Sequence, residues 1–128
     1  MCFRKPKRLQ IAFGVPFFNV YDKDGNSGEL AVRGNVNAFA KNYKKFLKRN
    51  GYETSDLYVF EDEIRSAIIP CVKQAVANAP KKYRLGVHQL DCKTEQIARE
   101  IKSDLAKTLK KRYKVKLINV EIAAIESI

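Results

Sequence analysis

The stretch "SGELAVRGNVNAFAKNYKKFLKRNG", residues 27–51, changes its periodicity halfway along. Apolar and polar residues alternate from Leu30 to Ala38, which is typical of a strand with one buried face. From Phe39 onward, apolar residues recur at helical spacing and the positions between them are mostly basic. Gly51 then supplies the residue type that favours a positive φ angle after a helix. We therefore expect a strand that leads directly into a basic helix of about three turns. The apolar stripe of this helix would be Phe39, Tyr43, Phe46 and Leu47.

The same alternation predicts an earlier strand over residues 9–17. Pro16 cannot donate a hydrogen bond to a neighbouring strand, so it indicates an edge strand or a break. Residues 22–28, "DKDGNSG", are dense in turn formers and favour a hairpin between the two strands. The expected buried face of the first strand is Leu9, Ile11, Phe13, Val15 and Phe17.

Two longer helices are expected in the second half of the chain. One runs from about residue 56 to 79, where residues 54–56 are all suitable N-caps and Pro70 should kink or divide the helix. Residues 79–86, "APKKYRLG", are interpreted as a loop. The other helix covers residues 94–112. Its apolar stripe would be Ile97, Ile101, Leu105 and Leu109.

The chain closes with a predicted strand over residues 113–125, in which the apolar residues change sides near Ile118. Either both faces are covered or a β-bulge resets the register there. Residues 1–128 therefore form a single domain with a basic N-terminal arm over residues 1–8. The expected fold class is α+β, in the order β-β-α-α-α-β, with about three helices on one face of a small, mostly antiparallel sheet.

The net charge of +11 would attract nucleic acid, an anionic lipid surface or an acidic protein, and it does not choose among them. No apolar run approaches the roughly 18 residues of a membrane span, and the N-terminus lacks a signal-peptide pattern. A cytoplasmic location is expected, peripheral to a membrane in the full-length protein. The cysteines, Cys2, Cys71 and Cys92, show no paired spacing that would indicate a disulfide framework.

The hairpin loop contains part of a calcium-binding pattern. Asp22, Asp24 and Asn26 take the first, third and fifth positions of an EF-hand loop. However, Ser27 replaces the required glycine, and Arg33, a cation, replaces the bidentate glutamate. The flanking segments are also predicted strands instead of helices. We therefore interpret the loop as a plain turn, with calcium binding as the alternative.

Two other groups could carry chemistry. His88 and Cys92 lie four residues apart, but a zinc site needs about four ligands and a cysteine nucleophile needs an oriented base. We interpret them as part of a loop before a helix, with an enzymatic site as the alternative. Cys71 lies beside an apolar stripe and is expected in the core. The acidic residues 61–63 suit the first turns of a helix. Phosphate-binding and hydrolase motifs are absent, so we expect no enzyme, cofactor or metal.

Basic residues gather in four clusters. They are Arg4, Lys5, Lys7 and Arg8; Lys41, Lys44, Lys45, Lys48 and Arg49; Lys81, Lys82 and Arg84; and Lys107, Lys110, Lys111, Arg112, Lys114 and Lys116. They are either solvated faces or the binding surface of an anionic partner. Tyr43, Tyr83 and Tyr113 lie among them and could either stack on nucleic-acid bases or be amphipathic residues at the edge of the core. The predicted partner surface is Lys41, Lys44, Lys45, Lys48, Arg49, Lys107, Lys110, Lys111 and Arg112.

Three segments together resemble the later part of an SPFH (prohibitin-homology) domain, nearest to its virion-core-protein-like subgroup. They are "ELAVRGNVNAFAKNYKKFL", "GYETSDLYVFEDEIRSAI" and "TEQIAREIKSDLAKTLKKRYKVKLINVEIAAI". The resemblance covers residues 9–128 and departs from the family at "AKNY", where aspartate and proline are usual. Tyr113 or Lys114 also stands where the family has glycine before the last strand. The missing upstream strands and helical tail indicate an excised part of a domain or a truncated relative.

The resemblance implies a non-catalytic scaffold that lies against the cytoplasmic side of a membrane. Such a module would assemble with itself or with other SPFH-type subunits, and its basic faces would contact anionic lipid or an acidic protein. The alternative function is a nucleic-acid-binding module that uses the same lysines and arginines.

Overall fold

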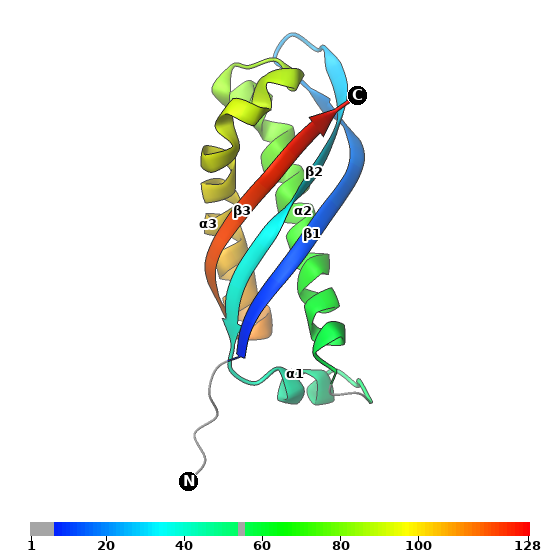
Figure 1. Ribbon diagram of the computed structural model, residues 1–128, viewed down its shortest axis with the longest axis vertical. Helices are drawn as coiled ribbons and strands as arrows, with labels where there is room; N and C mark the ends of the chain where they lie inside the picture. The colour runs from blue at the N-terminus through cyan, green and yellow to red at the C-terminus, as the bar shows by residue number, and fades with distance from the viewer. Residues whose placement is uncertain (1–6, 54–55) are drawn as a thin grey trace.

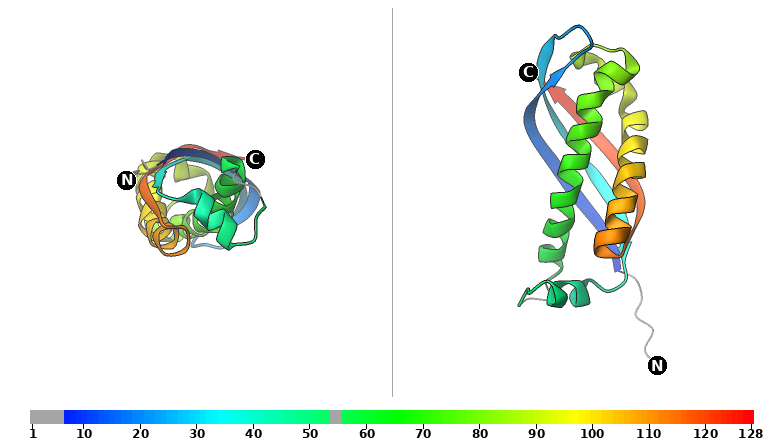
Figure 2. Two further views of the ribbon diagram at one scale, coloured as in Figure 1. Left: turned by 90° about the horizontal axis from the view of Figure 1, so that it is seen from below. Right: turned by 180° about the vertical axis from the view of Figure 1, so that it is seen from behind.

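The computed structural model describes residues 7–53 and 56–128. Strands β1 and β2 are followed by helices α1 and α2, a short 3-10 helix η1, helix α3 and strand β3. Their bounds are Lys7–Tyr21 for β1, Ser27–Ala40 for β2, Tyr43–Arg49 for α1, Leu57–Tyr83 for α2, Val87–Lys93 for η1, Thr94–Tyr113 for α3 and Val115–Ser127 for β3. The strands form one antiparallel sheet in the order β1-β2-β3, which α2 and α3 cover on one face (Figures 1 and 2). The expected α+β class and element order are confirmed.

The core lies between the sheet and the two long helices. Alternate residues of β1 and β2 point into it, and the predicted apolar stripe of α3 is buried completely. Helix α2 contributes a similar row of buried apolar side chains, one at every fourth position. Among the most buried side chains are Leu9, Ile11, Val36, Phe60, Ile64, Ile68, Ile97, Ile101, Leu105 and Leu109. None of the described helices covers the opposite face of the sheet (Figure 1).

Strand β1 lies at an edge of the sheet and is also interrupted, as Pro16 predicts. Val15 pairs with Val32 and Phe18 pairs with Leu30, so Pro16 and Phe17 stand opposite a single residue of β2. This bulge turns Phe17 away from the core, and 46% of its surface is exposed. The prediction that Phe17 is buried was wrong because the alternation continues through a register shift that the sequence does not reveal.

Strand β3 contains the predicted bulge and a second one. Ile118 is the extra residue between the Asn37–Asn119 and Ala38–Leu117 pairs. Ala123 is the extra residue at the second bulge, where Arg33 pairs with Ala124 and Gly34 pairs with Ile122. The first bulge explains the change of phase in the sequence, because Leu117 and Val120 are both buried on the side of the helices.

The helix boundaries differ from the expected ones in three places. Strand β2 continues to Ala40, so Phe39 belongs to the strand and α1 is shorter than predicted, at 7 residues. Helix α2 passes through Pro70 without a break and ends only at Tyr83, so most of the expected loop over residues 79–86 is helical. Pro70 is tolerated because it is exposed, where water can solvate the backbone carbonyl that loses its partner.

The predicted ends of the long helices are otherwise confirmed. Asp56 is the N-cap of α2, and its side chain accepts a hydrogen bond from the Tyr58 backbone N–H; the other two candidate caps, residues 54–55, lie outside the described residues. Gly51 has a φ angle of 81°, as expected after α1. Helix α3 extends one residue beyond the predicted 94–112. Of the expected basic arm over residues 1–8, residues 7 and 8 belong to β1 and the remainder lies outside the described residues.

Candidate anion-binding site

The topology brings basic clusters from distant parts of the chain to one end of the molecule. In the sheet, Ala40 pairs with Lys7 on one side and with Val115 on the other. The start of β1, the end of β2 and the start of β3 therefore meet at the same end, where α1 begins and α3 finishes (Figure 1). We call this the basic end. The cluster of Lys81, Lys82 and Arg84 lies at the opposite end, where α2 finishes.

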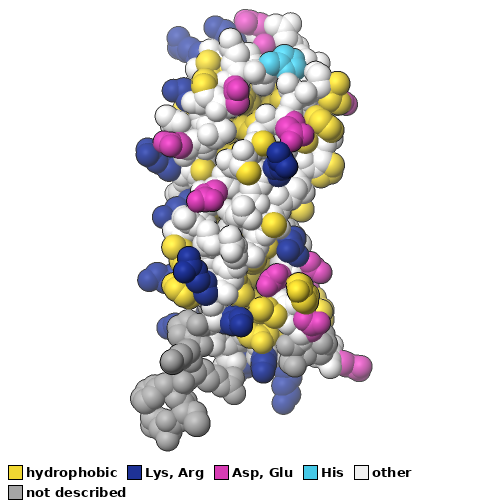
Figure 3. Space-filling view, viewed as in Figure 1, with side chains coloured by type: hydrophobic (Ala, Val, Ile, Leu, Met, Phe, Trp, Pro, Cys, Tyr) yellow, Lys and Arg dark blue, Asp and Glu magenta, His cyan; other side chains and the backbone are white. Residues whose placement is uncertain are grey.

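Figure 3 shows Lys and Arg side chains at the lower end of the displayed face and along the side formed by α3. Acidic side chains also occur there, toward the lower right, where the first turns of α2 lie. The two sides of the basic end therefore differ in charge. The positive side is formed by α1 and the end of α3, and the acidic side by the first turns of α2. The predicted surface residues on both helices are exposed.

A pocket of about 360 Å³ lies between α1 and the end of α3. Its described lining contains five cations and no carboxylate. The lining residues are Lys41, Asn42, Lys45, Phe46, Arg49, Asn50, Arg112, Tyr113 and Lys114. We call it the basic pocket. Four members of the predicted partner surface line it: Lys41, Lys45, Arg49 and Arg112. The other five, Lys44, Lys48, Lys107, Lys110 and Lys111, are exposed outside it.

Aromatic side chains form the apolar part of the pocket and attach it to the core. The ring centroids of Phe46 and Tyr113 are 5.1 Å apart, and Phe46 also contacts Phe60 of α2 at 5.4 Å. The Tyr113 hydroxyl donates to the backbone carbonyl of Glu63 at 3.2 Å, and the Arg112 guanidinium lies 5.3 Å from the Tyr113 ring. Because these contacts join α1, α2 and α3, the backbone that carries the cations is fixed by core packing.

Lys114 is the lining cation that the predicted partner surface did not include. It ends α3 in the left-handed conformation, with φ 57° and ψ 36°, and its backbone N–H donates to the Leu109 carbonyl. Glycine is the usual residue at such a helix end. The sequence contained one signal for Lys114. A basic residue stands at this position, between α3 and the last strand, where a glycine is expected.

The tyrosines among the basic clusters already pack against, or donate hydrogen bonds to, other residues of the chain. Tyr113 is only 4% exposed, and Tyr43 is half-buried against Phe60 with ring centroids 5.8 Å apart. The Tyr83 hydroxyl donates to the Glu100 carboxylate, which also pairs with Lys82 at 2.5 Å. Of the two alternatives for Tyr113, the structure favours a residue of the core over one that stacks on bases, because its ring packs against Phe46 of α1 and Phe60 of α2.

The hairpin loop is a turn between two strands, as interpreted from the sequence. The backbone N–H groups of Asp24 and Asn26 both donate to Asp22 Oδ1 at 2.9 Å. Desolvation by burial opposes ionisation of Asp22, but these hydrogen bonds outweigh it and lower the pKa of the carboxyl group. One oxygen of the Asp22 carboxylate is thus committed to holding the loop.

His88 and Cys92 are both exposed on η1. The Cys92 thiol donates to the Gln89 carbonyl at 3.1 Å, and the His88 ring lies over Gly28 of the hairpin. Burial raises the pKa of the Cys71 thiol, which packs partly buried against the core as predicted. Cys2 lies outside the described residues. Within residues 7–53 and 56–128, no three His, Cys, Asp or Glu side chains are placed to hold a metal ion.

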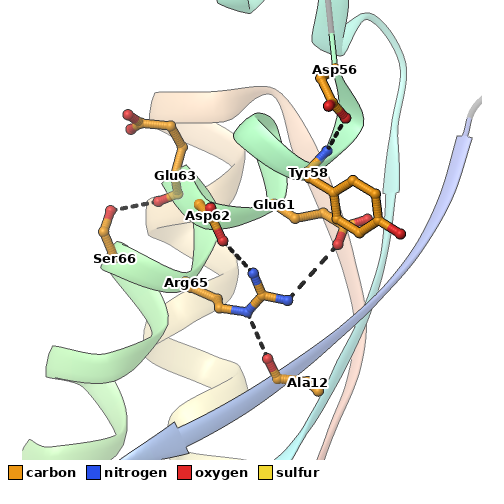
Figure 4. A network of polar contacts seen from close by, with 8 residues as sticks. All are labelled: Ala12, Asp56, Tyr58, Glu61, Asp62, Glu63, Arg65 and Ser66. Atoms are coloured by element: carbon orange, nitrogen blue, oxygen red, sulfur yellow. Dashed lines mark hydrogen bonds and ion pairs between the residues drawn. The ribbon is translucent and has the colours of Figure 1, made fainter.

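The acidic residues at the start of α2 belong to a structural network (Figure 4). Arg65 Nε donates to the Ala12 carbonyl of β1 at 2.8 Å, and its guanidinium pairs with Asp62 at 2.5 Å and with Glu61 at 3.9 Å. Tyr52 donates its hydroxyl proton to the Glu63 carboxylate. These contacts tie α2 to the edge strand and to the segment after α1.

A larger groove of about 550 Å³ lies between α3 and the edge of β3. Its lining carries both signs of charge, with Glu95 and Glu121 beside Arg99 and Lys102. It therefore has no net preference for an anion. In contrast to this groove, the basic pocket has a lining that favours one class of ligand, an anion.

The sequence matches no protein-family model, and comparison with curated proteins finds no significant relative. None of the described helices combines the length and hydropathy needed to cross a bilayer.

Proposed function

We propose that this chain is a non-catalytic scaffold module of the SPFH type that docks its basic end on an anionic membrane surface. The observation that supports the proposal is the convergence of two predicted basic clusters, on α1 and at the end of α3, around one pocket whose described lining has no carboxylate. A single concentrated patch binds an anionic surface better than the same charges spread over the molecule, because each cation near the surface contributes about 1 kcal/mol within a Debye length.

An exposed aromatic residue near the same end favours a lipid surface. Phe39, the last residue but one of β2, is 36% exposed. Tyr58 is 73% exposed, but it lies in the first turn of α2, on the acidic side of this end. Aromatic rings commonly occupy the interface between headgroups and hydrocarbon, where one part of the side chain is apolar and the other is wet. Cations with an exposed ring nearby suit a peripheral membrane contact.

Nucleic acid is the alternative anionic partner. The lysines and arginines would suit phosphates equally well. However, the engaged state of Tyr43, Tyr83 and Tyr113 leaves these rings poorly placed for base stacking. Assembly with copies of this chain or with other SPFH-type subunits rests on the sequence resemblance, and sedimentation equilibrium of the purified protein tests it.

Sedimentation with vesicles tests the membrane proposal. We expect binding to vesicles that contain phosphatidylserine, little binding to neutral phosphatidylcholine vesicles, and release by about 0.5 M salt. Charge reversal at the basic end, Lys110→Glu with Lys111→Glu, should abolish this binding. The matched control, Lys81→Glu with Arg84→Glu at the opposite end, makes the same change in net charge and should retain most of it.

Three results would count against the proposal. Equal binding to neutral vesicles would remove the electrostatic mechanism, and equal loss in both charge-reversal variants would remove the role of the basic end. Binding to duplex DNA or RNA with a steep dependence on salt, combined with no binding to vesicles, would favour the nucleic-acid alternative.

A further inference from the structure

Two basic residues hold a backbone conformation that is unfavourable for them. Within the described residues, Arg84 with φ 54° and Lys114 with φ 57° are the non-glycine residues with a positive φ angle. Each one ends a long helix, α2 and α3 respectively. Glycine adopts this conformation without the steric conflict between Cβ and backbone that other residues have. A residue other than glycine here indicates that its side chain has a use or that the neighbourhood enforces the conformation.

Favourable interaction with the helix dipole can account for a cation near the end of either helix. That explanation applies to both residues alike. Their surroundings differ, because Lys114 lines the basic pocket with Lys41, Lys45 and Arg112, whereas Arg84 lies at the opposite end of the molecule. Lys114 therefore adds a cation to the pocket at the expense of a favourable backbone conformation.

The lining of the basic pocket specifies the charge of its ligand. Five cations from two separate segments face a volume of about 360 Å³, together with the side chains of Asn42 and Asn50. A single phosphate would neutralise only part of this charge. The volume also falls within the range of small-molecule sites, at roughly 300–1,000 Å³. Phe46, which is only partly buried, supplies an apolar surface that suits the C–H groups of a ring between the phosphates.

We propose that the basic pocket binds a compact ring that carries two or more phosphate groups, with Lys114 as a specificity-determining contact. The inference rests on the proposed function, because it names the headgroup chemistry that the basic end recognises. The ring can be the headgroup of a phosphoinositide lipid or a soluble inositol phosphate. Both sources present the same chemistry to the pocket, and separate experiments distinguish them.

Isothermal titration calorimetry with inositol trisphosphate tests the pocket directly. We expect saturable binding of one molecule per chain, with an affinity that falls as salt rises. Inositol without phosphates is the matched control and should give no heat of binding. Absence of saturable binding of inositol trisphosphate would overturn the inference.

Vesicles identify the source. One set contains phosphatidylinositol bisphosphate, and a second set has the same surface charge supplied by phosphatidylserine. Stronger binding to the first set supports a lipid headgroup as the ligand. Equal binding to both sets of vesicles, together with saturable binding of inositol trisphosphate in the calorimetric assay, supports the pocket and assigns it to a soluble phosphate.

The two strained residues provide a paired test. Lys114→Gly and Arg84→Gly remove the same charge and relieve the same backbone conformation, so each should have a melting temperature equal to or above that of the natural protein. Only Lys114→Gly should weaken the binding of inositol trisphosphate, by about fivefold. Equal affinities in the two variants would overturn the role of Lys114.

Failure of this inference can be distinguished from failure of the proposed function. If phosphatidylserine vesicles still bind in a manner sensitive to Lys110→Glu with Lys111→Glu, but inositol trisphosphate does not bind, the basic end is a diffuse electrostatic patch without a specific pocket. If inositol trisphosphate binds and neither set of vesicles does, the pocket is retained and the membrane proposal is wrong.

Discussion

The backbone of Gly34 in β2 packs so closely against Glu121 in β3 that a Cβ atom at position 34 would overlap the Glu121 carbonyl oxygen. The same Cβ would lie 2.8 Å from the ring of Phe13 in β1. Neither neighbour can move easily, since one is backbone and the other is core. We expect Gly34→Ala to lower the free energy of unfolding by about 2–3 kcal/mol, measured by urea denaturation.

Gly14 is the matched control for this substitution. It lies on β1, and a Cβ atom there would meet nothing within 4 Å. Gly14→Ala should therefore change the free energy of unfolding by no more than about 0.5 kcal/mol, or increase it slightly. Similar stabilities of the two alanine variants would show that β2 and β3 do not pair in the register described here.

Arg65 should stabilise the attachment of α2 to the edge strand. Arg65→Met keeps the aliphatic stem but loses the hydrogen bond to the Ala12 carbonyl and the pairs with Asp62 and Glu61. Because the side chain is about one-third exposed, we expect a loss of only about 1 kcal/mol in the free energy of unfolding.

Asp62→Asn separates the two kinds of contact that Arg65 makes. It weakens the exposed ion pair and leaves the hydrogen bond to Ala12 in place, so the loss should stay below about 0.5 kcal/mol. Equal losses for Arg65→Met and Asp62→Asn, measured by the same denaturation assay, would assign the stabilisation to the ion pair instead of the contact with β1.

The Tyr83–Glu100 hydrogen bond should give the protein a dependence on alkaline pH. This bond, together with partial desolvation and the nearby charge, raises the pKa of Tyr83 to about 12. A raised pKa means that the contribution to stability is fully present below the ordinary tyrosine pKa of about 10 and is lost as the pH rises through the folded value. The difference in unfolding free energy between the natural protein and Tyr83→Phe should therefore be constant up to about pH 10 and then shrink.

Ultraviolet difference absorbance between these two proteins reports the titration of Tyr83 itself. The phenolate signal that Tyr83→Phe removes should be centred near pH 12. A midpoint at the ordinary value of about 10 would mean that Tyr83 does not donate to Glu100 in solution.

Much of the fold could be predicted from local periodicity. The alternation from Leu30 to Ala38 and the four-residue spacing from Ile97 to Leu109 each describe one face of one element, so they need no knowledge of the neighbours. Phe17 shows where this reasoning fails. The alternation includes it, but a bulge depends on how β1 pairs with β2, which local periodicity does not record.

The site was only partly predictable for a related reason. The basic clusters are visible as runs in the sequence, and five of their lysines and arginines line the pocket. The clusters meet because Ala40 pairs with Val115. This pair brings the start of α1 close to the start of β3, although the two are far apart in the sequence. Lys114 was overlooked as a site residue because its backbone conformation, and not its residue type, distinguishes it.

Hydrogen–deuterium exchange in the presence of phosphatidylserine vesicles tests most directly whether the basic end is the contact surface. We expect slower exchange in peptides covering residues 41–53 and 107–116, and no change in peptides covering residues 79–90. Protection of residues 79–90, protection of the uncovered sheet face alone, or no protection anywhere despite binding would rule out the basic end as the contact surface.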